Sequence, residues 1–232
     1  MRRVMIGTPC YDGRLDVWYT NSLCDTIKQS YKHNVEIIPM WISFDALLQR
    51  ARNDTIHLAL ELDVDDLIWI DSDIEWQPDW FFKLLDYPED VVGGTYPKKS
   101  DIEQYVFRTD NLTNILNEHG LLEMNGLGTG FVKMSKVACQ SLWDSSITYL
   151  DPKDNKERRM VFDVAIENIN GVNCLVSEDI NAFNKLQAAG FKIWLDPNMT
   201  CNHTGPKKYT GNFTNWLTKY LFKITKDIKK QL

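Results

Sequence analysis

The sequence predicts an α/β fold with a central, mostly parallel sheet flanked by helices. Apolar runs of about four to six residues, the length of a buried strand, alternate with stretches whose apolar residues recur at helical spacing. The chain has 232 residues, of which 44% are hydrophobic and 25% charged. These values are those of an ordinary globular chain, and a chain of this length can bury one sizeable core. We therefore expect one domain over residues 1–210.

The first half of the chain shows this alternation most regularly. Strands are predicted, in order, at residues 4–7, 35–38 and 67–70. Apolar residues four apart predict a helix after the first strand: Leu23, Ile27 and Tyr31. Ser43 is the expected N-cap of a second helix. The apolar stripe of this second helix consists of Phe44, Leu47, Leu48, Ala51 and Leu58.

The second half contains the same kinds of segment, separated by longer polar stretches. A helix is predicted around "PDWFFKLL", a strand at residues 91–94, and a loop or small hairpin from Lys98 to about Glu118. "GLGTGFVKMSK" predicts a glycine-rich turn that opens into a strand, and the polar run "DPKDNKERR" predicts a surface loop. "SEDINAFNKLQAAG" predicts a helix that ends at Gly190, and the strand "FKIWL" follows it.

Charge and composition narrow the functional class. The net charge of −6 argues against a nucleic-acid partner, because a surface that follows phosphates is usually basic. No run approaches the ~20 apolar residues that a membrane span needs. The five cysteines are odd in number and lack CxxC spacing, which indicates reduced thiols. We expect a cytoplasmic protein.

Two aspartates, Asp71 and Asp73, follow the third predicted strand in the stretch "LIWIDSDIEW". Residues i and i+2 of an extended chain point to the same side, so both carboxylates could aim at one point. Ligands of parallel sheets bind beyond the carboxyl ends of the strands, where this pair would lie. Two convergent carboxylates favour a divalent cation between them, with open positions for a diphosphate. The alternative is a pair of solvated turn residues.

Four segments, in order, resemble the family-2-like glycosyltransferases with a GT-A fold. These segments are "LLQRARNDTIHLALELDVDDLIWIDSDIEW", "NGLGTGFVKMSK", "VFDV" and "SEDINAFNKLQAAGFKIWLDPNMTCNHTG". The resemblance spans residues 3 to 205 and implies a Rossmann-like sheet that binds a nucleotide-diphosphate sugar. It also implies transfer of the sugar, from UDP, to a hydroxyl of a glycan or glycoconjugate. The first loop, "TPCYDG", departs from the family's commoner Pro-x-Tyr-Asn pattern.

The resemblance also implies roles for individual residues. The metal ligands, for Mn²⁺ or Mg²⁺, would be Asp71, Asp73 and His203. Asp179 would be the general base of an inverting transfer, with Glu178 as the second candidate. The residues that would contact the nucleotide or the donor sugar are Thr8, Pro9, Tyr11, Asp12, Arg52, Asn53, Asp71, Ser72, Asp73, Gly128, Thr129 and Gly130.

Each of these assignments has a structural alternative. His203 could be a loop histidine that hydrogen bonds its neighbours, and Arg52 and Asn53 could be surface residues of a helix. Glu178 and Asp179 would suit the first turn of a helix, where the helix dipole favours acidic side chains. A strand that ends in Asp-x-Asp also resembles the active-site strand of the haloacid-dehalogenase phosphatases. A second alternative is a glycosyltransferase-like domain that binds a sugar nucleotide or glycan without catalysis.

Residues 211–232 predict a basic amphipathic helix. Seven apolar residues recur at helical spacing among five lysines and one aspartate: Phe213, Trp216, Leu217, Tyr220, Leu221, Ile224 and Ile228. Such a helix could lie on a membrane surface, which would make the protein peripheral to a membrane. Packing of the apolar stripe on the domain itself is the alternative.

Overall fold

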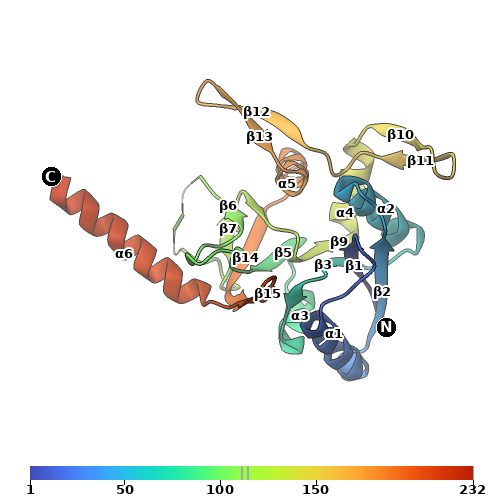
Figure 1. Cartoon of the computed structure of the whole chain (residues 1–232), viewed down its shortest axis with the longest axis horizontal. Coiled ribbons are helices and arrows are strands. Elements are labelled where there is room, and N and C mark those ends of the chain that lie inside the picture. The colour runs from blue at the N-terminus through green and yellow to red at the C-terminus, as the bar shows by residue number, and fades with distance from the viewer. Residues whose placement is uncertain (111, 114, 232) are drawn as a thin grey trace.

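The computed structural model describes residues 1–110, 112–113 and 115–231. Residues 111 and 114 of the predicted polar loop, and the last residue of the predicted C-terminal helix, lie outside this part of the chain. The fold is a mixed α/β fold around a seven-stranded sheet (Figure 1). In spatial order the strands are β2 (Val35–Ser43), β1 (Arg2–Cys10), β3 (Asp66–Ile70), β9 (Phe131–Ser135), β5 (Val91–Thr95), β14 (Ile193–Thr200) and β7 (Leu122–Met124).

Most strands of this sheet run in one direction. β1 is parallel to both β2 and β3, and β14 is parallel to β5. β9 lies antiparallel between β3 and β5, which gives those two strands the same direction. β7 is the antiparallel strand at the edge beside β14. The predicted fold class, a mostly parallel sheet of Rossmann-like type with flanking helices, is confirmed.

Alternate residues of the central strands feed two separate apolar cores. On β3, Leu67 and Trp69 belong to one core and Ile68 and Ile70 to the other, because successive strand residues point to opposite faces. One face is covered by α1 (Val17–Ser30) and α3 (Pro78–Asp86). The other face is covered by α2 (Leu48–Glu61), α4 (Lys136–Ser145) and α5 (Glu178–Ala188).

Small antiparallel units surround the main sheet. β4 (Ile74–Glu75), β15 (Asn202–Thr204) and β16 (Lys208–Tyr209) form a three-stranded sheet in which β15 lies in the middle. β6 (Phe107–Arg108) pairs with β8 (Gly126–Leu127). β10 (Thr148–Asp151) with β11 (Lys156–Arg159), and β12 (Ala165–Ile169) with β13 (Val172–Val176), form two hairpins at the periphery (Figure 1).

The apolar stripe predicted for α2 starts before the helix itself does. Ser43 is the last residue of β2 rather than an N-cap, and Phe44 has a φ of 60° and an exposed fraction of 80%. A left-handed residue cannot continue into a helix, so α2 starts only at Leu48. Tyr31, the last of the three residues that predict α1, lies beyond the end of that helix, in the 3-10 turn η1 (Tyr31–His33), and is exposed.

One other prediction needs correction, and a hairpin and a helix were missed. The polar run from Asp151 is not only a loop, because its ends pair as β10 and β11. The hairpin of β12 and β13 and the helix α4 were not predicted. α4 buries only Ala138, Cys139 and Leu142, so its apolar pattern is short.

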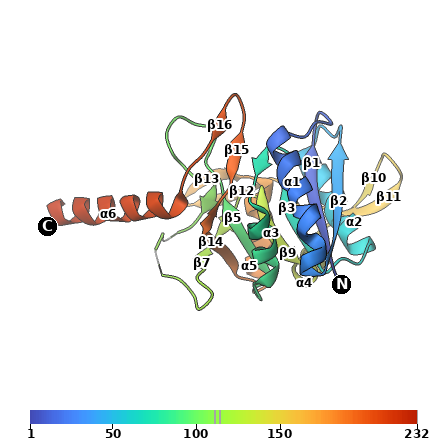
Figure 2. The same cartoon turned by 90° about the horizontal axis from the view of Figure 1, so that it is seen from below.

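The C-terminal helix is present as α6 (Phe213–Gln231). Phe213 and Leu217 are buried against the domain, and Trp216 stacks at 5.8 Å on Phe213 and at 5.0 Å on Tyr220. Beyond this contact the helix extends away from the body of the molecule (Figure 2). Among the described residues, no helix is long and apolar enough to cross a membrane.

Candidate functional site

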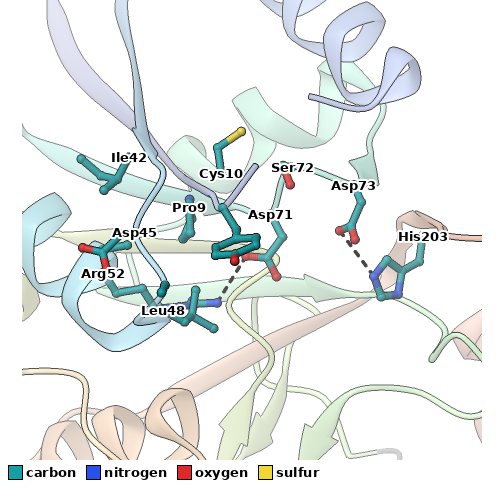
Figure 3. A pocket seen from close by; sticks show the side chains of 13 residues that line it. Pro9, Cys10, Ile42, Asp45, Leu48, Arg52, Asp71, Ser72, Asp73 and His203 are labelled. Carbon is teal, nitrogen blue, oxygen red and sulfur yellow. Dashed lines mark hydrogen bonds and ion pairs between the residues drawn. The ribbon is translucent and has the colours of Figure 1, made fainter. Parts of the chain in front are cut away.

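A cavity of about 360 Å³ lies at the carboxyl ends of β1, β2 and β3. Pro9 and Cys10 come from the end of β1, Ile42 from β2, and Asp71 follows β3. Parallel neighbours end at the same edge of the sheet, which is why these residues meet (Figure 3). The remaining wall consists of Tyr11, Asp45, Ala46, Leu48, Ala51, Arg52, Ser72, Asp73 and His203.

Asp71 and Asp73 both line this cavity, but not as neighbours on an extended strand. β3 ends at Ile70, and the N–H of Ile74 donates to the carbonyl of Asp71 at 3.1 Å, which closes a turn over residues 71–74. The N–H of Asp71 donates to the carbonyl of Gly130 at 3.3 Å. The turn, rather than the alternation of a strand, aims the two carboxylates into the cavity.

Basic side chains from two other segments approach Asp73. Lys99 Nζ lies 2.5 Å from Asp73 Oδ2. His203 Nε2 lies 3.4 Å from Asp73 Oδ1 (Figure 3). His203 is brought here by the antiparallel pairing of β15 with β4. Its Nδ1 lies 3.0 Å from the carbonyl of Pro97, a partner that requires a proton on Nδ1.

Arg52 is buried in the wall of the cavity. Its side chain is 4% exposed, and its guanidinium lies over the rings of Trp69 and Phe162, at 5.7 and 5.8 Å. Arg52 Nη2 lies 3.3 Å from Asp71 Oδ1, and Nε lies 3.6 Å from Glu178 Oε1. Among the described residues, Nε and Nη1 have no hydrogen-bond partner. Arg52 therefore links Asp71, after β3, to Glu178 at the start of α5, and its Nε and Nη1 donate no hydrogen bond within the described residues.

Glu178 and Asp179 begin α5 and have different hydrogen-bond and ion-pair partners. Glu178 pairs with Arg52, whereas Asp179 Oδ1 accepts from its neighbours, the N–H of Ile180 at 2.8 Å and the hydroxyl of Ser177. Ser177 occupies the N-cap position, but its side chain makes no capping hydrogen bond. Within the described part of the chain, the second carboxylate oxygen of Asp179 has no hydrogen-bond partner, which favours Asp179 over Glu178 as a proton acceptor.

The carboxylates of this region perturb one another's pKa. Burial raises the pKa of Asp71; the charge of Arg52 opposes this shift, and the charges of Asp73 and Asp179 add to it. Burial also raises the pKa of Glu178, again against Arg52. Burial acts to raise the pKa of Asp73 too, but the hydrogen bonds from His203 and Lys99 outweigh it, and the pKa is lowered. The cluster contains more negative charge than its own cations compensate, so a further cation would be stabilised there.

Three of the residues predicted to contact the nucleotide lie away from the cavity wall. Thr8 is fully buried, and its hydroxyl lies 2.7 Å from the hydroxyl of Tyr19, inside the core. Asn53 is also fully buried: Phe162 donates its N–H to Asn53 Oδ1 at 2.7 Å, and Asn53 Nδ2 donates to the Phe162 carbonyl at 3.3 Å. Asp12 is exposed and accepts from the N–H of Arg14. None of these three side chains lines the cavity.

The glycine-rich turn packs closely against Tyr96. A Cβ added to Gly128 would lie 2.2 Å from the hydroxyl of Tyr96, and one added to Gly130 would lie 2.7 Å from the same ring. The glycines are therefore needed for the close approach of Tyr96. Thr129 is 1% exposed, and its hydroxyl has no hydrogen-bond partner among the described residues. The turn does not line the cavity but contacts Asp71 through Gly130.

Replacing Asn53 by Ala is expected to lower the free energy of unfolding by about 1–3 kcal/mol, because two buried backbone groups of Phe162 lose their partner. Urea denaturation of the variant measures this change. Asn21, exposed on α1, provides the matched control, and Asn21→Ala should stay within about 0.5 kcal/mol of the parent. An unchanged midpoint for Asn53→Ala would show that Phe162 finds other partners.

The structure adds site residues that the sequence did not indicate. Lys99 reaches Asp73 from the segment after β5, and its only sequence signal is the basic pair that follows that strand. Asp45 lines the cavity, although it is 5% exposed and is paired with Arg50 and Lys153, each at 2.7 Å. The hydrogen bond from Arg50 is the main cause that lowers the pKa of Asp45. Asp45 therefore stays charged and fixes the loop after β2.

The three predicted metal ligands meet at the cavity wall without forming a ready-made metal centre. Across residues 1–110, 112–113 and 115–231, no three His, Cys, Asp or Glu side chains are grouped closely enough to hold a metal ion. Arg52 engages Asp71, and Lys99 engages Asp73. A cation at this wall would need ligands beyond the protein's own, as well as the release of Asp73 by Lys99.

No protein-family model matches the chain, and no curated protein matches it. Among solved structures, the chain is similar to the crystal structure of A197 from STIV, with a TM-score of 0.59 over 91% of this chain and 95% of that chain. The two chains share a fold. Their sequence identity is 15%, so the similarity shows the fold alone.

Two further solved structures are more distant. A glycosyltransferase involved in the glycosylation of the major capsid of PBCV-1 has a TM-score of 0.36 and 12% identity, over 60% of this chain and 63% of that chain. The 4-diphosphocytidyl-2C-methyl-D-erythritolsynthase from Anaerococcus prevotii DSM 20548 has a TM-score of 0.35 and 10% identity, over 80% and 96%. At these TM-scores, neither similarity bears on the activity of this chain.

Proposed function

We propose that this chain is a GT-A glycosyltransferase that moves a sugar from a nucleotide diphosphate to a hydroxyl of a glycan or glycoconjugate. UDP is the first candidate for the nucleotide, and inversion at the anomeric carbon is the expected outcome. One observation carries the proposal: two carboxylates, Asp71 and Asp73, line a cavity at the carboxyl ends of three parallel strands.

The wall of the cavity divides into a part suited to a base and a part suited to a diphosphate. Pro9, Tyr11, Ile42 and Leu48 offer apolar surface for a flat ring. Asp71, Asp73 and His203 form the polar side, next to the buried guanidinium of Arg52. The positive charge of Arg52, beside Asp71, would favour an anionic phosphate oxygen on this side of the cavity.

The donor set fits a divalent cation that phosphate oxygens help to hold. The Pro97 carbonyl engages Nδ1 of His203, so Nε2, at 3.4 Å from the Asp73 carboxylate, is the nitrogen that a cation would bind in place of a proton. A mixed imidazole and carboxylate set suits Mn²⁺ better than Mg²⁺. When bound, the cation would neutralise charge on the departing nucleoside diphosphate.

Asp179 would act as the general base. Its free carboxylate oxygen would take the proton of the acceptor hydroxyl while the hydroxyl oxygen attacks the anomeric carbon. Its other oxygen is fixed by the N–H of Ile180, so the side chain is oriented before substrate binds. Glu178, paired with Arg52, would orient the start of α5 and stabilise the guanidinium.

Thermal unfolding of the purified chain tests the proposal. UDP, GDP, CMP and dTDP are each added with and without Mn²⁺. A ligand at about 100 times its Kd stabilises a fold by roughly 2.7 kcal/mol, which raises the melting temperature by about 5–10 °C for a chain of this size. We expect a shift that needs both one nucleotide and the metal.

The same samples separate the alternatives. A nucleotide-dependent shift without sugar transfer to any tested acceptor would leave a binding module. No shift at saturating nucleotide, together with a trapped aspartyl-phosphate on Asp71, would identify a phosphatase and overturn the proposal.

A further inference from the structure

A second cavity, of about 410 Å³, lies against the small sheet in which β4 pairs with β15. Segments that are far apart in the sequence build its wall: the end of β4, the start of α3, β14, β15 and the residues that precede α6. Its volume falls within the range of small-molecule sites, about 300–1,000 Å³. Most of the lining side chains are polar: Glu75, Gln77, Asn198, Thr200, Asn202 and Asn212. Such a wall suits a ligand with many hydrogen-bonding groups rather than an apolar one.

This second cavity is separate from the one at the strand ends. Asn202 of β15 lies opposite Glu75 of β4, and both side chains line the second cavity. His203, the next residue of β15, lines the first cavity instead, because successive residues of a strand point to opposite faces. The two cavities therefore lie on opposite faces of the small sheet, and they share no lining residue.

Hydrogen bonds within the protein fix the orientation of two amides of this wall. Asn202 Nδ2 donates to Glu75 Oε2 at 2.7 Å, which leaves Asn202 Oδ1 without a hydrogen-bond partner among the described residues. The N–H of Asn215 donates to Asn212 Oδ1 at 2.9 Å, so Nδ2 is the end of that amide that stays unpaired there. Gln77 is exposed, and its side chain forms no hydrogen bond within the described part of the chain. The wall thus presents both acceptors and donors, and a hydroxyl group can bond to either.

Trp80 gives the cavity its apolar surface. It packs against the core yet stays partly exposed, and within the described residues its ring stacks on no other aromatic ring. Trp76, by contrast, is 3% exposed, lies edge-on to Tyr19 at 5.2 Å and donates its Nε1–H to Thr26. Trp76 therefore belongs to the core, and Trp80 is the indole with surface left for a ligand. A flat indole offers a large apolar contact area, and one side of a sugar ring consists of C–H groups.

The charges at this wall cancel. Among the described residues that line the cavity, only Glu75 is charged, and its Oε2 lies 2.7 Å from Lys208 Nζ. The wall therefore has no excess positive charge to attract a phosphate or a carboxylate, and no excess negative charge to attract a cation. An uncharged polar ligand is the class that it fits.

We propose that this second cavity binds a sugar unit of a neutral glycan. The C–H face of the sugar ring would lie on Trp80, and its hydroxyls would bond to Asn202 Oδ1, Asn212 Nδ2 and the amide of Gln77. A saccharide matches the wall in three respects, since it is uncharged, has one apolar face and carries hydroxyls that both donate and accept. The inference does not depend on the proposed sugar transfer, because no residue of the first cavity takes part in it.

Saturation-transfer NMR of the full chain, without nucleotide or Mn²⁺, tests this proposal. The probes are neutral trisaccharides of glucose, mannose, galactose and N-acetylglucosamine, with trigalacturonic acid as the anionic comparison. We expect at least one neutral trisaccharide to bind and trigalacturonic acid not to bind. Trp80→Ala should weaken that binding about tenfold, because the apolar contact is lost. Gln77→Ala, a change at an exposed side chain, should weaken it about threefold.

Trp143→Ala is the matched control. Trp143, on α4, is also a partly exposed indole packed against a core, but it does not line this cavity, and its variant should bind like the parent. A melting curve of each variant separates loss of the fold from loss of binding. If Trp80→Ala unfolds, Gln77→Ala decides, and unchanged binding in Gln77→Ala would then overturn the proposal. Binding of no neutral trisaccharide, tighter binding of trigalacturonic acid, or equal losses in Trp80→Ala and Trp143→Ala would overturn it as well.

Discussion

The Asp73→Asn variant is expected to lose metal-dependent sugar transfer by a factor on the order of 10²–10³ while the fold stays intact. The substitution removes the charge that attracts the cation at the cavity wall, where His203 and Lys99 already compete for the same carboxylate. The pairs that Asp73 makes are partly exposed, so their loss should cost at most about 1 kcal/mol of stability. Initial rates against Mn²⁺ concentration, with a melting curve for each variant, measure both effects.

Glu75 provides the matched control for this experiment. It lies two residues further along on β4, but its carboxylate accepts from Asn202 and Lys208 and lines a different cavity. Glu75→Gln should leave the dependence of the rate on Mn²⁺ unchanged. Full activity of Asp73→Asn at ordinary Mn²⁺ concentrations would remove Asp73 from the proposed metal site.

The Asp179→Asn variant is expected to lower kcat by a factor of about 10²–10⁴, because an amide cannot take the proton of the acceptor hydroxyl. Its carbonyl oxygen can still accept from the N–H of Ile180, so the start of α5 should keep its geometry. KM for the donor should change little. The measurement is kcat and KM at saturating Mn²⁺, with donor hydrolysis followed separately from transfer.

Glu178→Gln separates catalysis from support of the site. Its carboxylate pairs with buried Arg52, so the variant should lose stability and weaken donor binding more than it lowers kcat. The opposite pattern, a low kcat for Glu178→Gln and a normal kcat for Asp179→Asn, would transfer the role of base to Glu178.

The strands of the central sheet were predictable because each is encoded by a short, continuous apolar run. All five residues of β3 are buried, and a run such as "LIWI" can satisfy two apolar faces only inside a covered sheet. The end of that run also located Asp71 and Asp73 at the sheet edge. The helix α5 was predictable for the same reason, since its apolar spacing and the terminal Gly190, with a φ of 91°, lie within one short segment.

The functions of polar residues on α2 were not predictable from local sequence. Arg52 and Asn53 are adjacent, yet one lines the cavity and the other holds the backbone of Phe162. Lys99 gave no pattern of its own, because its partner Asp73 lies on a distant segment. In each case the role depends on a tertiary contact, and periodicity contains no information about that contact.

Local conformation explains the remaining errors. The left-handed backbone at Phe44 interrupts what looks like a continuous helical stripe, and it moves Leu47 out of the helix into the N-cap position. At the glycine-rich turn, the sequence indicated that something approaches the backbone closely, but not that Tyr96 of the same chain does so.

The pairing of β15 with β4 also determines when the site can form during synthesis. The strands β1 to β3 that frame the cavity are synthesised well before β15, which carries His203. A nascent chain could therefore present the cavity and both aspartates before it acquires the imidazole. Long-range pairings of this kind also slow folding, because a large loop must close before they form. We would expect affinity for Mn²⁺ to appear late in refolding, after the parallel core is protected from hydrogen exchange.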